Sequence, residues 1–181
     1  MPTIGVAVGL PEPHATFLQE ARRATGDPLA DRIRTHITLL PPTDVPGVGL
    51  AVIEEHLAVV ASRQRRFVVV LDRVGTFRPV SPVQFLEVTQ GAADCTALAE
   101  AVRSGPLARQ LGFPYHPHVT IAQQVSDEAL DEVGNRLSNY RLRFEVGSFQ
   151  LFEQGGDEAW RPVRAFPLAS VGPAEPPNGL G

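Results

Sequence analysis

Two short segments of this chain carry the same pattern, and together they restrict its fold more than any other feature. Each places a histidine, a β-branched apolar residue, a threonine and a second aliphatic residue in that order. They read HITL at His36–Leu39 and HVTI at His118–Ile121. Because alternate side chains of a strand point to the same face, the histidine and threonine of each segment share one face. The pattern therefore predicts two strands that each present an imidazole beside a hydroxyl group.

The elements around the two segments repeat in the same order. In each half, periodicity predicts a strand, a helix, the motif strand, a second helix and a further strand. His36 lies 32 residues after Ile4, and His118 lies 35 residues after Val83. We therefore predict one α+β domain over residues 1–171, built from two pseudo-symmetric lobes. Each lobe would hold an antiparallel-rich sheet backed by helices, with the cleft between the lobes.

The boundaries of this layout follow from prolines and glycines. The two lobes are predicted to meet near residue 78, as roughly residues 1–78 and 79–171. Residues 172–181 are rich in proline and glycine, and we expect a disordered tail there. Pro41 and Pro42 are predicted to end the first motif strand.

Two further strands are expected toward the end of the chain. Residues 141–152 are predicted to form one long strand. Residues 160–168 are predicted to form an edge strand, because Pro162 interrupts them.

Several polar residues receive structural interpretations. Asp94 and Ser126 are predicted to cap the N-termini of two helices. Cys95 lies in a helical pattern among small and apolar residues, which favours a buried structural role. His14 is interpreted as exposed, and His56 as a hydrogen-bonded histidine at the boundary of the core.

Composition excludes several classes of function. The 181 residues carry a formal net charge of −4, which argues against a long basic surface for nucleic acid. A short or small anion in a local pocket remains compatible with this charge. The single cysteine provides neither a disulfide framework nor a cysteine-based zinc site. No apolar run approaches the length of a membrane span, so we expect a cytoplasmic protein. We also expect it to be a monomer.

The paired motifs, their separation of 82 residues and the repeated layout resemble the 2H phosphoesterase superfamily, also called the LigT-like or 2′-5′ RNA ligase-like family. The resemblance covers about residues 3–168. It implies a bilobal α+β fold and a site that needs neither a metal ion nor another cofactor. His36 and His118 would be catalytic, while Thr38 and Thr120 would bind phosphate. The implied substrates are RNA ends with a 2′,3′-cyclic phosphate, small cyclic nucleotides, or 2′-5′ linkages.

The chemistry of such a site can also be argued from the residues. Opening a cyclic phosphodiester requires a base that deprotonates water and an acid that protonates the leaving oxygen. An unperturbed imidazole has a pKa near 6.5, so two histidines can fill both roles near neutral pH. Hydroxyl groups beside them can donate hydrogen bonds to the non-bridging oxygens. The sequence leaves open which histidine is the base and which is the acid.

Further residues are candidate substrate contacts. Tyr115, with Phe113, could stack on a base or pack beneath its strand. His116 could touch substrate, and Arg34 could approach the phosphate. Many members of the resembled family carry an arginine shortly after the second motif, where this chain has Gln123. A neutral amide at this position can donate hydrogen bonds but supplies no charge.

Three other interpretations stay open. His116 and His118 could hold a metal ion with an acidic third ligand, although neither an HExxH motif nor a cysteine cluster supports such a site. The chain could instead be a non-catalytic module that binds RNA ends or nucleotides. It could also join RNA through 2′-5′ linkages without ATP, which reverses the cleavage reaction. Sensitivity to chelators, turnover and product identity distinguish these interpretations.

Overall fold

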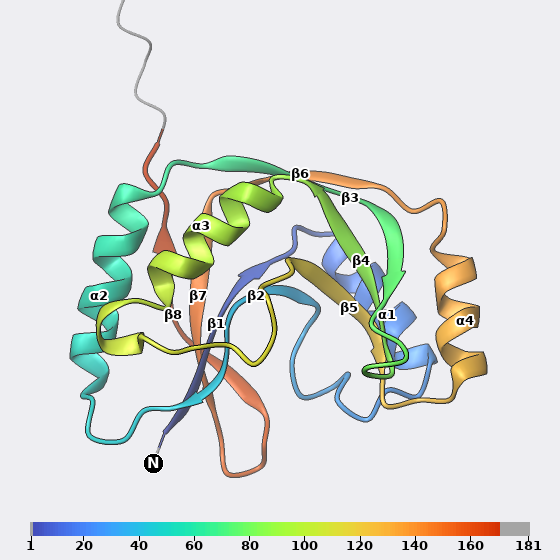
Figure 1. The fold of residues 1–181 in the computed structure, drawn as a ribbon, viewed down its shortest axis with the longest axis horizontal. Helices are drawn as coiled ribbons and strands as arrows, with labels where there is room; N and C mark the ends of the chain where they lie inside the picture. The colour runs from blue at the N-terminus through green and yellow to red at the C-terminus, as the bar shows by residue number, and fades with distance from the viewer. Residues whose placement is uncertain (1, 171–181) are drawn as a thin grey trace, which may run out of the picture.

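Eight antiparallel strands and four α-helices occur in residues 2–170, the part of the chain described by the computed structural model (Figure 1). The strands form one curled sheet in the order β6-β3-β4-β5-β2-β1-β7-β8. The predicted α+β class is therefore confirmed. The strands are β1 (Thr3–Gly9), β2 (His36–Asp44), β3 (Phe67–Thr76), β4 (Val83–Gln90), β5 (His118–Gln123), β6 (Leu142–Val146), β7 (Ser148–Gln154) and β8 (Trp160–Pro167). The helices are α1 (His14–Ala24), α2 (Leu50–Arg63), α3 (Ala92–Val102) and α4 (Asp127–Arg136), and a short 3₁₀ turn spans Gly105–Leu107.

The two motif strands lie side by side in the middle of the sheet. β2 and β5 run antiparallel and pair through Ile37 and Val119. In this register, the histidine of each motif lies opposite the threonine of the other. Two segments that are far apart in the sequence are thus joined at the centre of the fold.

The two halves of the sheet do not coincide with the two halves of the sequence. One half holds β2, β1, β7 and β8, and the other holds β5, β4, β3 and β6. β3 comes from the first sequence repeat but pairs with β4 and β6 of the second. β7 comes from the second repeat but pairs with β1 of the first. The lobes therefore exchange strands, and a boundary near residue 78 does not separate them.

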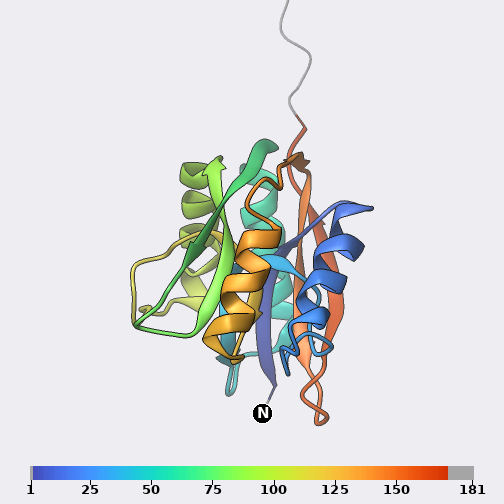
Figure 2. The same ribbon diagram turned by 90° about the vertical axis from the view of Figure 1, so that its right-hand side faces the viewer.

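Helices cover the sheet in two groups. Figure 1 shows α2 and α3 together at one side and α1 and α4 at the other, and Figure 2 shows α4 in front of the sheet. The aliphatic residues of both motifs are fully buried in the core, as their alternation predicts; they are Ile37, Leu39, Val119 and Ile121. Cys95 on α3 is also buried, and burial raises the pKa of its thiol to about 12. Its structural interpretation is confirmed.

The prediction of one long strand over residues 141–152 is wrong. β6 ends at Val146, and β7 begins at Ser148 on the far side of Gly147. The buried positions change parity here, from Leu142 and Val146 to Phe149 and Leu151. Since a shift of one residue exchanges the two faces of a strand, this change marks a new strand. The chain then crosses from β3 to β1, from one half of the sheet to the other.

The prediction that prolines end the first motif strand is also wrong. β2 continues through Pro41 and Pro42 to Asp44. Its pairing with β1 passes from Leu40 opposite Val6 to Thr43 opposite Ile4, so both prolines face one residue, Gly5. Such a β-bulge leaves positions that need not donate a ladder hydrogen bond, and proline is tolerated there.

Asp94 does not cap α3, contrary to its prediction. The N-cap is Gly91, with a φ of 84°. A Cβ atom at this residue would overlap the carbonyl oxygen of Val68. Left-handed backbone and this close approach both require glycine. Asp94 lies within the first turn instead, where its charge favours the positive end of the helix dipole.

The cap predicted at Ser126 is confirmed, since its Oγ accepts a hydrogen bond from the backbone N–H of Ala129 at 3.3 Å. We expect Ser126→Ala to lower the free energy of unfolding by about 1 kcal/mol, because a free N–H at the start of α4 loses its acceptor. Urea denaturation measures this loss. Ser62→Ala is the matched control, since Ser62 only donates to Val59 within α2. An equal loss in both variants would contradict the capping role.

The predictions for the last strand and for His56 are confirmed, and that for His14 is wrong. β8 lies at the edge of the sheet and contains Pro162, so the predicted edge strand is confirmed. His56 is half-buried with Nε2 3.1 Å from the carbonyl oxygen of Val102, also as predicted. His14 is half-buried, with Nδ1 2.6 Å from the Tyr140 hydroxyl oxygen, so the prediction that it is exposed is wrong.

The predicted disordered tail at residues 172–181 lies outside the described residues. Within residues 2–170, no helix combines the length and apolar character that crossing a bilayer would require.

Candidate active site

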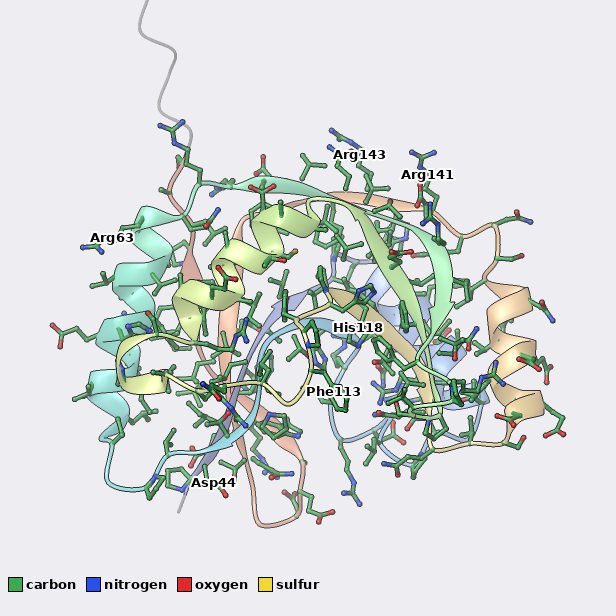
Figure 3. All side chains as sticks on the ribbon, viewed as in Figure 1. Asp44, Arg63, Phe113, His118, Arg141 and Arg143 are labelled. Carbon is green, nitrogen blue, oxygen red and sulfur yellow. The ribbon has the colours of Figure 1, made fainter. Side chains whose placement is uncertain are left out.

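The structure brings the four motif residues together on the open face of the sheet. His36 and Thr38 on β2, and His118 and Thr120 on β5, are all half-buried. The two histidines are diagonal neighbours across the strand pair, close enough for long or aromatic side chains on one face to reach each other. Figure 3 shows His118 near the middle of the molecule.

Both imidazoles are held by the backbone in the same way. Nδ1 of His36 lies 2.7 Å from the carbonyl oxygen of Arg34, and Nδ1 of His118 lies 2.7 Å from that of His116. A carbonyl oxygen only accepts, so each Nδ1 carries the proton and donates it. In the neutral ring, Nε2 is then the basic nitrogen. The backbone thereby fixes the tautomer that leaves Nε2 available for proton transfer.

The hydroxyl of Thr38 is engaged with the first histidine. Its Oγ1 lies 3.0 Å from Nε2 of His36. Because Nδ1 holds the ring proton, Nε2 accepts this hydrogen bond from the hydroxyl. A phosphate oxygen that recruits the hydroxyl would free the lone pair of Nε2.

Burial favours the neutral form of both histidines. It lowers the pKa of His36 to about 4, with smaller contributions from the positive charges of Arg22 and His118. It also lowers the pKa of His118, with a further contribution from His116. The backbone hydrogen bonds oppose this shift in both cases. A negatively charged phosphate between the rings would raise both pKa values again.

A cavity of about 380 Å³ opens on the His36 side of the site. Its volume falls within the range of small-molecule sites. Thr38, Thr120 and Gln123 line it together with His36. Its wall also includes the aromatic rings of Phe152 and Trp160 and the side chains of Arg22 and Arg32.

A second, more apolar cavity of about 700 Å³ opens on the His118 side. His118 lies edge-on to Phe77, with ring centroids 5.0 Å apart, and 5.3 Å from Phe85. Phe113 and Val80 line the outer part and are exposed by 73% and 74%. The site therefore has a polar side around His36 and an apolar side around His118.

Tyr115 and His116 take different positions beside the second motif. The Tyr115 hydroxyl donates to the carbonyl oxygen of Thr38 at 2.8 Å, and burial raises the pKa of this phenol. The guanidinium of Arg103 lies 5.1 Å above the same ring. Tyr115 is thus tied to the backbone of β2, while Phe113 stays exposed on the loop before β5 (Figure 3). His116 is exposed at the mouth of the apolar cavity.

Gln123 and Arg34 are separated by the fold. Gln123 lines the polar cavity, and its backbone N–H donates to Oδ2 of Asp27 at 3.2 Å. The Arg34 side chain is 65% exposed and pairs with Glu12 at 2.9 Å. It lines a neighbouring cavity, which His36 also lines, but not the cavity that His36 shares with Thr120.

Sequence reasoning missed two charged residues, Arg22, which lines the polar cavity, and its partner Asp27, which does not. Arg22 on α1 and Asp27, just after it, form a fully buried ion pair. A signal was present, because Arg22 follows the buried Leu18 by one helical turn and so falls on the apolar stripe. A charge on a buried stripe is almost always paired or functional. No pattern in the sequence indicated that Asp27 is buried and pairs with Arg22.

A metal site at His116 and His118 would require a third ligand close to both imidazoles. Across residues 2–170, no three histidine, cysteine, aspartate or glutamate side chains gather in a way that could hold a metal ion. The third, acidic ligand that this interpretation places beside His116 and His118 is thus not found there.

Known proteins are similar to this chain in amino-acid sequence. The family model of the 2'-5' RNA ligase superfamily matches residues 10–158. A Bacillus cytotoxicus protein named "Putative phosphoesterase" is 31% identical over 144 residues, which cover 78% of this chain and 83% of that one. A Bacillus cereus protein of the same description is 29% identical over the same coverage.

Solved structures show the same fold. E. coli LigT complexed with 3'-AMP aligns with a TM-score of 0.62 and 23% identity, over 93% of this chain and 99% of that one. The protein TT0787 of Thermus thermophilus aligns with a TM-score of 0.63 and 21% identity over the same shares. Both share the fold of this chain. With the match of the family model over most of its length, the chain belongs to the 2'-5' RNA ligase superfamily of LigT-like 2H phosphoesterases.

Proposed function

We propose that this protein is a metal-independent phosphodiesterase that opens 2′,3′-cyclic phosphates at RNA ends or in small nucleotides, or cleaves small 2′-5′-linked nucleotides. The observation that carries the proposal is the pairing of β2 with β5. It makes the two histidines diagonal neighbours, each with Nδ1 held by the backbone. Such an arrangement supports acid–base catalysis on both sides of one phosphorus atom.

In the proposed reaction, one histidine takes a proton from water through Nε2 as the water oxygen attacks phosphorus. The bond from phosphorus to the 2′ or 3′ oxygen breaks, and the protonated second histidine supplies a proton to that leaving oxygen. Thr38 and Thr120 donate hydrogen bonds to the non-bridging oxygens, whose negative charge must be held through the transition state. The low pKa of His36 favours it as the base, and His118 then acts as the acid.

The volume of the polar cavity and the aromatic rings in its wall favour a nucleotide substrate. The polar cavity of about 380 Å³ suits a mononucleotide, and Trp160 and Phe152 provide rings on which a base can stack. LigT of E. coli, which shares the fold, has been solved with 3'-AMP and with ATP. These ligands support a nucleotide-sized substrate here.

A panel of phosphodiesters in metal-free buffer with a chelator tests the proposal. It contains a 2′,3′-cyclic mononucleotide, an RNA with a cyclic phosphate end, a 2′-5′ dinucleotide, and a 3′-5′ dinucleotide as control. We expect turnover of at least one of the first three, with products identified by mass spectrometry. Loss of turnover on chelation would contradict a metal-independent site. Binding without turnover would favour the non-catalytic module, and joined RNA ends would favour the ligase direction.

The pH dependence provides an independent check. One histidine must be neutral and the other protonated, so the reactive form of the free enzyme is most abundant between their two pKa values. The pKa of His36 is lowered to about 4, and that of His118 is lowered from 6.5. We therefore expect kcat/KM to peak below pH 6.5 and to fall by about tenfold per pH unit on the alkaline side. The kcat profile should lie at higher pH, because bound phosphate raises both pKa values.

Steady-state rates from about pH 4 to about pH 8 measure both profiles. A value of kcat/KM that keeps rising above pH 7 would contradict the assignment, because it would require a base with a raised pKa.

A further inference from the structure

The charge balance of the polar cavity is unusual for a phosphate site. Its motif residues provide two hydroxyls and an imidazole whose neutral form is favoured, and Gln123 provides a neutral amide. A phosphodiester is an anion, and its charge grows on the non-bridging oxygens during attack. Among the described residues that line this cavity, the fixed positive charges are those of Arg22 and Arg32, and no acidic side chain lines it.

The two arginines differ in how they are held. Arg32 is 43% exposed and pairs with Glu158 near the surface. The Arg22 side chain is 2% exposed, and its Nε lies 2.6 Å from Oδ2 of Asp27, which is fully buried. Nη2 of Arg22 is buried with no hydrogen-bond partner among the described residues. Desolvating a charged donor without an acceptor is costly, so such a group in a folded protein calls for an explanation.

Asp27 connects this arginine to the second motif strand. Its Oδ2 accepts from Nε of Arg22 and also from the backbone N–H of Gln123, at 3.2 Å. Its Oδ1 accepts from the backbone N–H of Leu29 at 2.8 Å. The carboxylate therefore accepts three hydrogen bonds, from α1, the following loop and β5. It fixes the guanidinium through Nε and leaves the Nη edge for another acceptor.

We propose that Arg22 is the cationic phosphate-binding residue of this cleft: Asp27 holds its Nε, and its Nη edge donates to a non-bridging oxygen of the substrate phosphate. This inference rests on the proposed function, since it names the group that holds the substrate anion. The planar guanidinium suits it, because one edge binds a carboxylate while another binds a phosphate oxygen. The positive charge of this site is therefore provided by α1, whereas its neutral donors Thr120 and Gln123 are provided by β5.

The test measures phosphate binding apart from turnover. Arg22→Met/Asp27→Asn removes both buried charges together, so that neither is left unpaired. By calorimetry with inorganic phosphate, we expect the Kd of this variant to rise on the order of 10- to 100-fold over that of the unaltered protein, as for loss of a hydrogen bond to a charged group. The KM for a 2′,3′-cyclic mononucleotide should rise in parallel. Arg23→Met is the matched control, because Arg23 lies next to Arg22 on α1 but is exposed and paired with Asp31; it should leave both values unchanged.

A second variant covers the case in which the double variant does not fold. Arg22→Lys keeps the charge, but a single ammonium cannot reproduce the forked contact with both Asp27 and phosphate. We expect a smaller rise of about tenfold in the phosphate Kd. A folded variant of either kind that binds phosphate as tightly as the unaltered protein would overturn the role of Arg22, as would an unaltered protein that binds no phosphate.

The two proposals fail in different ways. Phosphate binding that depends on Arg22, without turnover of any phosphodiester, would reject the hydrolase and retain this anion site. Turnover with phosphate binding independent of Arg22 would reject the anion site and retain the hydrolase.

Discussion

His36→Ala and His118→Ala are each expected to lower kcat/KM for a 2′,3′-cyclic mononucleotide on the order of 10²- to 10⁴-fold, the usual contribution of a positioned acid or base. Each variant removes one of the two proton-transfer groups while the paired strands β2 and β5 remain. Because the two groups act in one concerted step, the double variant should be little worse than either single one. Initial rates with the cyclic nucleotide measure these losses.

His56→Ala is the matched control for this pair. Like the two site histidines it is half-buried with a ring nitrogen against a backbone carbonyl, but it lies on α2 and faces Val102. Its kcat/KM should stay near that of the unaltered protein. If either His36→Ala or His118→Ala retained most of its rate while folded, the paired acid–base mechanism would be rejected.

Thr38→Val and Thr120→Val should each raise the activation barrier by about 2–4 kcal/mol, the effect of losing one donor to a developing oxyanion. This corresponds to a roughly 30- to 1000-fold loss in kcat. Valine keeps the shape of threonine and removes only the hydroxyl group. Thr38→Ser and Thr120→Ser keep the hydroxyl and should retain most of the activity.

The two threonines are also expected to differ. The Thr38 hydroxyl donates to Nε2 of His36, which stabilises the neutral ring. Thr38→Val should therefore raise the pKa of His36 and shift the acid side of the kcat/KM profile upward, whereas Thr120→Val should not. Thr43→Val is the control on the same strand, since its hydroxyl donates to the carbonyl oxygen of Pro41. Equal rates for Thr38→Val and Thr43→Val would contradict the phosphate-binding role.

Where one side chain or one turn decides a feature, the sequence predicted it well. The alternation in HITL and HVTI placed the imidazoles and hydroxyls on one face and the aliphatic residues in the core, as observed. Ser126 caps α4 because its cap bond spans only three residues. Pro162 marked an edge strand because a missing N–H is tolerated only there or at a bulge. These are short-range effects, and local pattern is sufficient to predict them.

Features that depend on neighbours from distant parts of the chain were missed or mistaken. The path from β6 to β7 depends on which strands, β3 or β1, offer a free edge. The two prolines stay within β2 because Gly5 of another strand allows a bulge opposite them. α3 begins after Gly91 and not at Asp94. The carbonyl oxygen of Val68 approaches this N-cap position so closely that only a glycine can occupy it.

The amino-acid sequence by itself determined the family, the two strands and the four side chains that they present. Only the tertiary structure decided that these strands pair through Ile37 and Val119, because register is fixed by long-range packing and not by either segment alone. It also decided the charge at the site. Arg22 and Asp27 pair in the buried interior, and burial lowers the pKa of His36. Burial is a property of the folded chain that no single segment carries.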